Sequence, residues 1–288
     1  MKKIMAFILG LVLIFLAACS NSPQTTTAST SGTSTEETTA STSEIITKTN
    51  EPTIFFHGYS GTINSFKSMI SRIETDGYAT KELVLTVATD GSITSEGTYT
   101  NTENNPIVQV LFADNKNNEW NQAEWVKDVL EYLQTTYNVQ AVNIVGHSMG
   151  GVSAFRYLTA YGYDTTLPKV TKFVGIGAPF NDFLDTSSSQ TIDELLANGP
   201  TEKSQRYLDY AAGITNVAAD IPVLLLAGQM SETDLSDETV PLTSALAPFQ
   251  LLQTNGNSVS YQIFMGIQHS QLHEEPAVDQ VVEKFLWG

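Results

Sequence analysis

One short motif, GHSMGG at residues 146–151, constrains the fold of this chain more than any other feature. The motif follows an apolar run at 139–145, typical of a buried strand, and precedes a stretch of helical period that extends to about Tyr161. In a G-x-S-x-G sequence the glycines permit a strand-to-helix turn too tight for side chains, and the central serine hydroxyl stays exposed. We therefore predict a strand–turn–helix unit that presents Ser148 as a nucleophile; a plain turn serine is the alternative.

The rest of the sequence repeats this alternation of strand and helix. Short apolar runs typical of buried strands occur at 53–56, 83–87, 107–112, 172–176, 223–226 and 259–264. Apolar residues at helical spacing occur at 66–73, 120–133 and 278–286, and weaker helical stretches lie near 192–197 and 202–212. Asp90-Gly91 predicts a hairpin turn into a returning segment near 95–100. The alternation predicts an α/β fold with a mostly parallel central sheet that helices cover on both faces.

The candidate base lies near the end of the chain. A serine hydroxyl is a weak nucleophile at neutral pH and needs an adjacent base that an acid orients. Two histidines follow Ser148, namely His269 and His273, both between the final strand and the final helix. We predict His269 as the base because it leaves the strand first and has room to point back. His273, closer to the helix, is the alternative.

The candidate acid lies in the loop after the apolar run at 223–226. This loop carries four carboxylates, Glu232, Asp234, Asp237 and Glu238. An orienting carboxylate at this position would face the base across the strand ends. We predict Asp237 in this role, with Asp234 as the alternative. A solvated charge run or a calcium site would be other uses of the cluster, although the spacing matches no recognised calcium-binding loop.

Hydrolysis of an acyl bond also needs donors aimed at the developing oxyanion. We predict that the backbone N–H of Met149, at the positive end of the helix after the elbow, is one donor. The second is the backbone N–H of Tyr59 in the loop HGYSG at 57–61, which follows the first core strand. His57 precedes the elbow in chain order, so we expect it to shape this loop by hydrogen bonding and not to act as a base.

Several segments together resemble those of α/β-hydrolases, especially bacterial lipases and esterases; they are the elbow at 146–151, the loop at 57–61, the segment at 237–241 and the segment at 269–276. In that family the acid is often followed by Gly, one residue, Val and Pro. Here Glu238 replaces the Gly, while Asp237 keeps its distance to Val240. His269 precedes Pro276 by seven residues, the spacing common between the catalytic His and the Pro that opens the last helix of the family.

The resemblance covers nearly all of residues 51–288 and is closest to a group of Gram-positive cell-surface hydrolases, many of them membrane-anchored. It implies an α/β-hydrolase fold in which Ser148, Asp237 and His269 cleave a small-molecule or lipid ester of a carboxylic acid through an acyl-enzyme. An amidase, thioesterase or acyltransferase would use the same triad, and a surface-binding protein of this fold would have no turnover. No P-loop, dinucleotide fingerprint or H-E-x-x-H motif occurs, so we expect neither a cofactor nor a metal.

The family also inserts cap or lid segments at the position of residues 181–220. An amphipathic lid would turn its apolar side to the pocket, and Phe180, Phe183 and Leu184 are candidates for that side. The alternative is that these three are ordinary core residues. A small cap is therefore one expectation for this segment, and a simple extension of the core is the other.

The N-terminal 50 residues predict export and attachment to a membrane. Lys2 and Lys3 precede an apolar run at 4–16, typical of a signal peptide over residues 1–18. The sequence LAAC at 16–19 resembles the bacterial lipoprotein box, so we predict a lipidated Cys19; a simple secretory signal is the alternative. Eighteen of the thirty-one residues at 20–50 are Ser or Thr, which predicts a disordered stalk over 19–50 before a hydrolase domain at 51–288.

This organisation predicts a lipoprotein on the outer face of the cytoplasmic membrane, partly released or fully retained, with the membrane as a partner through the lipid anchor. The net charge of −17 has the wrong sign for tracking a phosphate backbone, so we expect no nucleic-acid partner.

Overall fold

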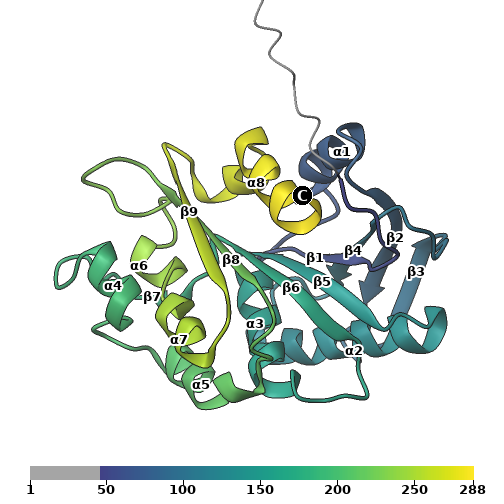
Figure 1. Cartoon of the computed structure of the whole chain (residues 1–288), viewed down its shortest axis with the longest axis horizontal. Coiled ribbons are helices and arrows are strands. Elements are labelled where there is room, and N and C mark those ends of the chain that lie inside the picture. Colours follow the sequence, from purple (N-terminus) through teal and green to yellow (C-terminus); the bar gives the residue numbers. More distant parts are fainter. Residues whose placement is uncertain (1–45) are drawn as a thin grey trace, which may run out of the picture. The chain divides into compact units, whose positions relative to one another are not determined.

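The computed structural model describes residues 46–288, so the predicted signal peptide, Cys19 and most of the stalk lie outside the described residues. The described chain forms an eight-stranded sheet from β1 (Thr53–Phe56), β2 (Thr80–Val87), β3 (Ile93–Gly97), β4 (Pro106–Phe112), β5 (Ala141–His147), β6 (Lys169–Ile176), β8 (Val223–Gln229) and β9 (Val259–Met265). The strand order is β3-β2-β4-β1-β5-β6-β8-β9. Only the β2–β3 pair is antiparallel, which is the predicted hairpin (Figure 1). The predicted mostly parallel α/β sheet is confirmed.

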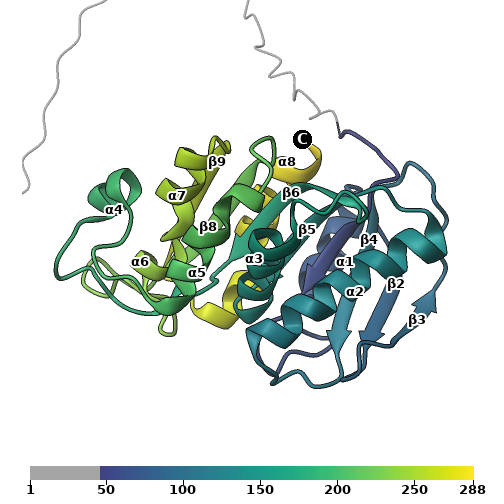
Figure 2. The ribbon, with the colours of Figure 1, turned by 90° about the horizontal axis from the view of Figure 1, so that it is seen from below.

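Helices cover both faces of this sheet. They are α1 (Lys67–Thr75), α2 (Glu119–Tyr137), α3 (Met149–Tyr161), α4 (Ile192–Asn198), α5 (Gln205–Gly213), α6 (Leu242–Ala245), α7 (Pro248–Asn255) and α8 (Pro276–Trp287), with short 3₁₀ turns η1 (Ile214–Asn216) and η2 (His269–His273). α1 and α8 pack on one face, and α2 and α3 pack on the other (Figures 1 and 2).

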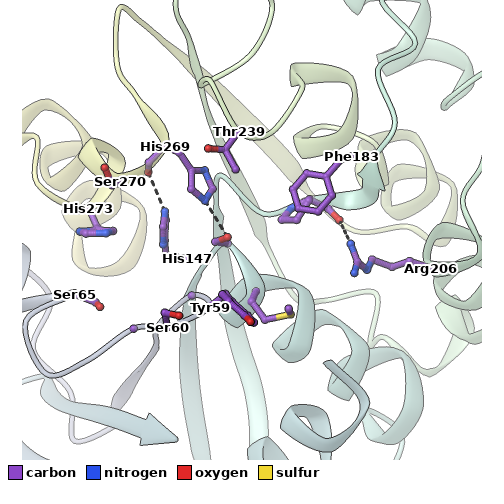
Figure 3. Close-up of a pocket in the computed structure, with 15 residues that line it drawn as sticks. Tyr59, Ser60, Ser65, His147, Phe183, Arg206, Thr239, His269, Ser270 and His273 are labelled. Carbon is purple, nitrogen blue, oxygen red and sulfur yellow. Dashed lines mark hydrogen bonds between the residues drawn. The ribbon is translucent and has the colours of Figure 1, made fainter. Parts of the chain in front are cut away.

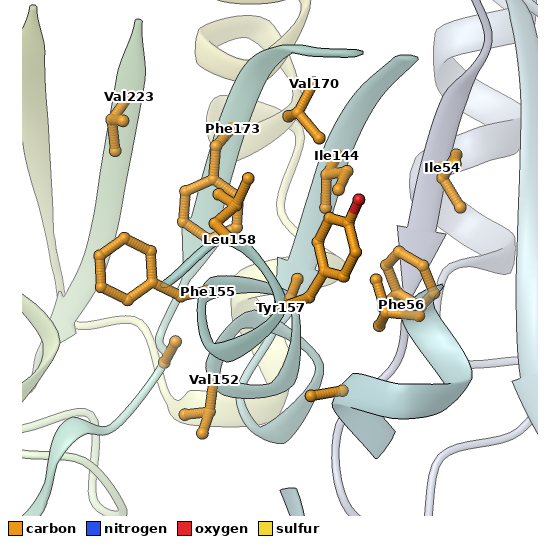
Figure 4. Close-up of a cluster of buried hydrophobic side chains, with 14 of the residues drawn as sticks. Ile54, Phe56, Ile144, Val152, Phe155, Tyr157, Leu158, Val170, Phe173 and Val223 are labelled. Atoms are coloured by element: carbon orange, nitrogen blue, oxygen red, sulfur yellow. The ribbon is translucent and has the colours of Figure 1, made fainter. Parts of the chain in front are cut away.

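The inner strands β1, β4 and β8 are almost wholly buried because both faces of the sheet are covered there, whereas the edge strands β3 and β9 are mostly exposed. In β1, Ile54 and Phe56 point to the face under α2 and α3, whereas Phe55 points to the face under α1 and α8. The larger core lies on the α3 side, where Phe155 packs against Phe173 of β6 with ring centroids 5.8 Å apart (Figure 4). Burying one such ring stabilises the fold by about 2–3 kcal/mol relative to leaving it exposed.

Two short elements differ from the sequence predictions. A four-residue strand, β7 (Phe180–Phe183), lies outside the eight-stranded sheet, and α7 was not predicted. The strand β5 is displaced by two residues from the predicted bounds of 139–145, and β6 begins three residues before the predicted start at 172 and ends at 176 as predicted. Within residues 46–288, no helix combines the length and apolar content needed to cross a membrane.

Candidate active site

The nucleophile elbow forms where β5 ends at His147 and α3 begins at Met149. Ser148, between them, has φ 53° and ψ −124°, a conformation that costs a non-glycine residue about 1–3 kcal/mol. Its N–H donates to the carbonyl of Ile176 at 2.9 Å, which holds the turn against β6. A Cβ on Gly150 would lie 2.2 Å from the carbonyl oxygen of Phe56, so only glycine allows this close approach. The strained turn therefore presents the Ser148 hydroxyl at the carboxyl edge of the sheet.

His269 contacts this hydroxyl directly. The Ser148 Oγ lies 2.9 Å from His269 Nε2, and the opposite ring nitrogen, Nδ1, lies 2.7 Å from Asp237 Oδ2. Because a carboxylate only accepts, Nδ1–H donates to Asp237 and Nε2 accepts from Ser148. The backbone N–H of His269 also donates to the carbonyl of Asp237 at 2.9 Å. The structure thus brings together the three residues predicted as nucleophile, base and acid; the ring of His269 is labelled in Figure 3.

Asp237 is held by its own loop. Its Oδ1 accepts the N–H groups of Thr239 at 3.0 Å and Val240 at 2.6 Å, and only 1% of the residue is exposed. Two local donors on one oxygen leave the other oxygen aimed at His269. The alternative acid, Asp234, is exposed, and its carboxylate accepts from the Ser236 hydroxyl at 2.7 Å.

The other three histidines surround this relay. His147, buried within the elbow, donates from Nε2–H to the carbonyl of His269 at 3.0 Å. The alternative base, His273, stacks edge-on against His147 with centroids 4.6 Å apart, and its Nδ1 lies 3.2 Å from Glu274. Burial lowers the pKa of His273 and holds that of His147 well below its usual range, so both are neutral at pH 7.

His57 shapes the neighbouring loop, as expected. Its Nε2 accepts the N–H of Phe112 at 3.2 Å, and its Nδ1–H donates to the carbonyl of Gly58 at 2.8 Å. Burial lowers the pKa of this ring as well. Although all four histidines gather here, no group of three or more His, Cys, Asp or Glu side chains in residues 46–288 is placed to hold a metal ion.

The two predicted oxyanion donors lie at the edge of the same cavity. The backbone N–H groups of Tyr59 and Met149 have no hydrogen-bond partner within the described part of the chain. For Met149 the reason is its place as the first residue of α3, where an N–H has no intrahelical acceptor. Both residues line the cavity that contains Ser148 and His269. Both N–H groups are therefore available as hydrogen-bond donors at this cavity.

This cavity has a volume of about 590 Å³. Of the three residues weighed as a lid surface, Phe180 is a core residue with no exposure, whereas Phe183 lines the cavity and is 61% exposed. Arg206, on α5, also lines the cavity and was not predicted. It donates to the buried Glu119 and pairs with Asp182 at 2.6 Å, so its charge is already matched. This ion-pair network joins segments far apart in the chain, so no local sequence pattern predicts it.

Among the solved structures that resemble this chain are two from Gram-positive bacteria. The product of the gene lin2722 from Listeria innocua shares 29% identity, with a TM-score of 0.75, over 82% of this chain and 93% of that one. A proposed cell surface hydrolase from Lactobacillus plantarum shares 22% identity, with a TM-score of 0.64, over 82% of this chain and 89% of that one. No curated protein matches the sequence. Residues 40–288 match the family described as alpha/beta hydrolase of unknown function (DUF915), and the chain belongs to that family.

Proposed function

We propose that this α/β hydrolase is a serine esterase that cleaves carboxylic esters through an acyl-enzyme on Ser148. The observation that carries the proposal is the continuous relay from Ser148 Oγ through His269 to Asp237, with contacts of 2.9 and 2.7 Å. Its opening into a cavity supports access for a substrate.

The mechanism follows from the donors and acceptors already described. As Ser148 Oγ attacks the ester carbonyl, its proton passes to His269 Nε2, and Asp237 stabilises the imidazolium. The N–H groups of Tyr59 and Met149 stabilise the oxyanion. When the tetrahedral intermediate collapses, His269 returns the proton to the leaving alcohol and the acyl group stays on Ser148. A water molecule, deprotonated by His269, then releases the acid and restores the hydroxyl.

Two features favour turnover over a binding role. Backbone strain at Ser148 costs stability, and the N–H groups of Tyr59 and Met149 have no hydrogen-bond partner among residues 46–288. A binding protein would gain nothing from this combination, whereas an acyl transferase or hydrolase needs both. Amide, thioester and acyl-transfer activities share the same relay and differ only in what the cavity accepts.

We also propose an extracytoplasmic location, with a signal peptide at 1–18, a lipidated Cys19 with a stalk to residue 50, and a hydrolase domain at 51–288. The N-terminal sequence supports this organisation. The Lactobacillus plantarum protein of similar fold, described as a proposed cell surface hydrolase, supports a surface location.

A fluorophosphonate probe tests the proposal. It should label the wild-type protein at Ser148, and Ser148→Ala should lose both labelling and ester hydrolysis, with turnover falling at least about 10³-fold. Ser71→Ala, exposed on α1, is the control and should keep both. Labelling that persists in Ser148→Ala would disprove the assignment.

A further inference from the structure

The cavity around Ser148 has two halves of different chemistry. On one side lie three serine hydroxyls and one imidazole, from Ser60, Ser65, Ser270 and His273 (Figure 3). Phe183 lies on the other side of His269 (Figure 3), and Pro179 and Met149 are further apolar residues that line the cavity. We call the first set the hydroxyl half and the second the apolar half.

The polar groups of the hydroxyl half have unused hydrogen-bonding capacity. Among residues 46–288, neither Ser60 Oγ nor Ser270 Oγ has a hydrogen-bond partner, and His273 Nε2 has none either. Ser65 Oγ accepts the N–H of Thr62 at 3.0 Å, and its own proton remains free. Each hydroxyl can donate once and accept twice, so the wall offers donors and acceptors together.

The backbone of Ser60 has a strained conformation. Its backbone has φ 59°, in the left-handed region where a glycine would be less strained. Its N–H donates to the carbonyl of Asn115 at 2.8 Å, which fixes the loop next to the Tyr59 donor. A serine in this conformation keeps a hydroxyl at the cavity wall that glycine would not provide.

The hydroxyl half carries no net charge at neutral pH. His273 is the titratable group on that wall; Glu274 lies against its Nδ1 and His147 against its ring, and burial keeps the imidazole neutral. Among residues 46–288, Arg206 is the one Lys or Arg that lines the cavity; it lies on the side of Phe183 (Figure 3) and is paired with Glu119 and Asp182. A carboxylate or phosphate would therefore find no free cation here, whereas neutral hydroxyl groups would find partners.

We propose that the hydroxyl half binds a polyhydroxylated alcohol, a sugar or a polyol, and that the apolar half holds the acyl group of the same ester. The leaving oxygen must take its proton from His269 Nε2, so the alcohol has to lie beside that ring. Ser270 and His273 belong to η2, the same short turn as His269, and so they flank this position. The inference rests on the proposed esterase function and specifies its substrate class.

The test uses pairs of esters that differ only in hydroxyl groups. Methyl 6-O-acetyl-glucopyranoside is compared with cyclohexylmethyl acetate, and glycerol monoacetate with propyl acetate. For the wild-type enzyme we expect kcat/KM to be at least about 5-fold higher for the hydroxylated member of a pair. Preference in the first pair assigns a sugar ring, and preference in the second pair alone assigns an open polyol; either supports the proposal.

The variant Ser60→Gly/Ser270→Ala tests the residues. Glycine is compatible with φ 59°, and Ser270 is exposed, so we expect the double variant to fold. The ratio of kcat/KM within the preferred pair should fall roughly 5- to 100-fold, the loss expected for two neutral hydrogen bonds. Ser71→Ala, outside the cavity, should keep the wild-type ratio.

Two results would overturn the inference and leave the proposed function intact. One is a ratio near 1 in both pairs for a wild-type enzyme that cleaves the esters. The other is a ratio that the double variant does not change. Failure to hydrolyse any of the four esters, together with no fluorophosphonate labelling, would instead disprove the esterase function itself.

Discussion

At the scale of single residues, the two histidines of η2 both pack against the ring of His147 but have different polar partners. His269 contacts Ser148 and Asp237, whereas His273 contacts Glu274. We expect His269→Ala to lower kcat on p-nitrophenyl acetate about 10³-fold or more, because no other base among residues 46–288 contacts Ser148 Oγ. His273→Ala should lower it less than about 10-fold. Steady-state kinetics on both variants measures these losses. A larger loss of kcat in His273→Ala than in His269→Ala would assign the role of base to His273.

In the acidic loop, the carboxylates of Asp237 and Asp234 also have different environments, the first buried and the second exposed. Asn at position 237 could still accept from Val240, but its amide would donate towards His269 Nδ1 and favour the wrong tautomer. Asp237→Asn should therefore lower kcat about 10²- to 10⁴-fold with little loss of stability. Asp234→Asn, on the exposed side of the loop, should change kcat less than about 2-fold. Equal losses in the two variants would contradict the predicted role of Asp237.

At the scale of elements, α8 packs a pair of buried acids against α1. Asp279 and Glu283 are each 2% exposed, and Arg72 of α1 donates to Asp279. Within residues 46–288, Asp279 Oδ1 and Glu283 Oε1 have no hydrogen-bond partner. Burial, together with nearby Asp76 and Asp279, raises the pKa of Glu283 from 4.5 to about 7. The charged form of Glu283 is therefore disfavoured in the folded protein.

The raised pKa of Glu283 predicts how the free energy of unfolding depends on pH. The folded state holds a proton on Glu283 that the unfolded state releases above about pH 4.5, so the contribution of Glu283 to stability falls as pH rises to about 7. Glu283→Gln removes that fall. Relative to wild type, the variant should gain about 1–3 kcal/mol in the free energy of unfolding between pH 5 and pH 8. Denaturant titrations of both proteins at the two pH values measure it; parallel pH curves would contradict the prediction.

The strands and helices that could be predicted from the sequence are those with a local pattern of buried residues. Runs such as TIFF in β1 are buried on both faces, and the α8 stripe of Val278, Val282 and Leu286 keeps helical spacing. Both patterns depend on local burial and were predictable. The four residues of β7 and the eight of α7 have no such period, because surrounding segments decide their conformation.

At the scale of the whole molecule, the sequence predicted which residues gather at the site but not the cavity around them. Each predicted residue stands beside a strand end or in a motif, so chain order and parallel strands bring Ser148, Asp237 and His269 to one edge. Arg206 and Ser65 reach the cavity from a later helix and an early loop, through tertiary packing without a local pattern. Ser60 and Ser270 adjoin predicted residues, but their free hydroxyls became evident only from the contacts.

The chain enters the domain far from this cavity. Thr47 donates its N–H to the carbonyl of Trp287 at 2.8 Å, and Asn105 Nδ2 donates to the carbonyl of Thr47 at 2.8 Å. Residues 46–52 therefore lie at the amino ends of the parallel strands, whereas Ser148 follows the carboxyl end of β5. Because β1 and β5 run in register, the two points are separated along the strands by roughly 20 Å at about 3.3 Å per residue.

Because of this separation, the length of the predicted tether decides whether the cavity can reach a bilayer. Residues 20–45 would span up to about 90 Å when extended, and removing 24–43 leaves six residues that reach about 20 Å. A domain of this length is roughly 40 Å across, so the short tether could not let the cavity turn to a membrane in which a lipidated Cys19 would be anchored. On vesicles, deletion of 24–43 should therefore lower hydrolysis of an ester held in the same bilayer and leave hydrolysis of a soluble ester unchanged. Cys19→Ser, which cannot be lipidated, is the unanchored control; a rise in bilayer activity after the deletion would mean that the cavity already faces the membrane.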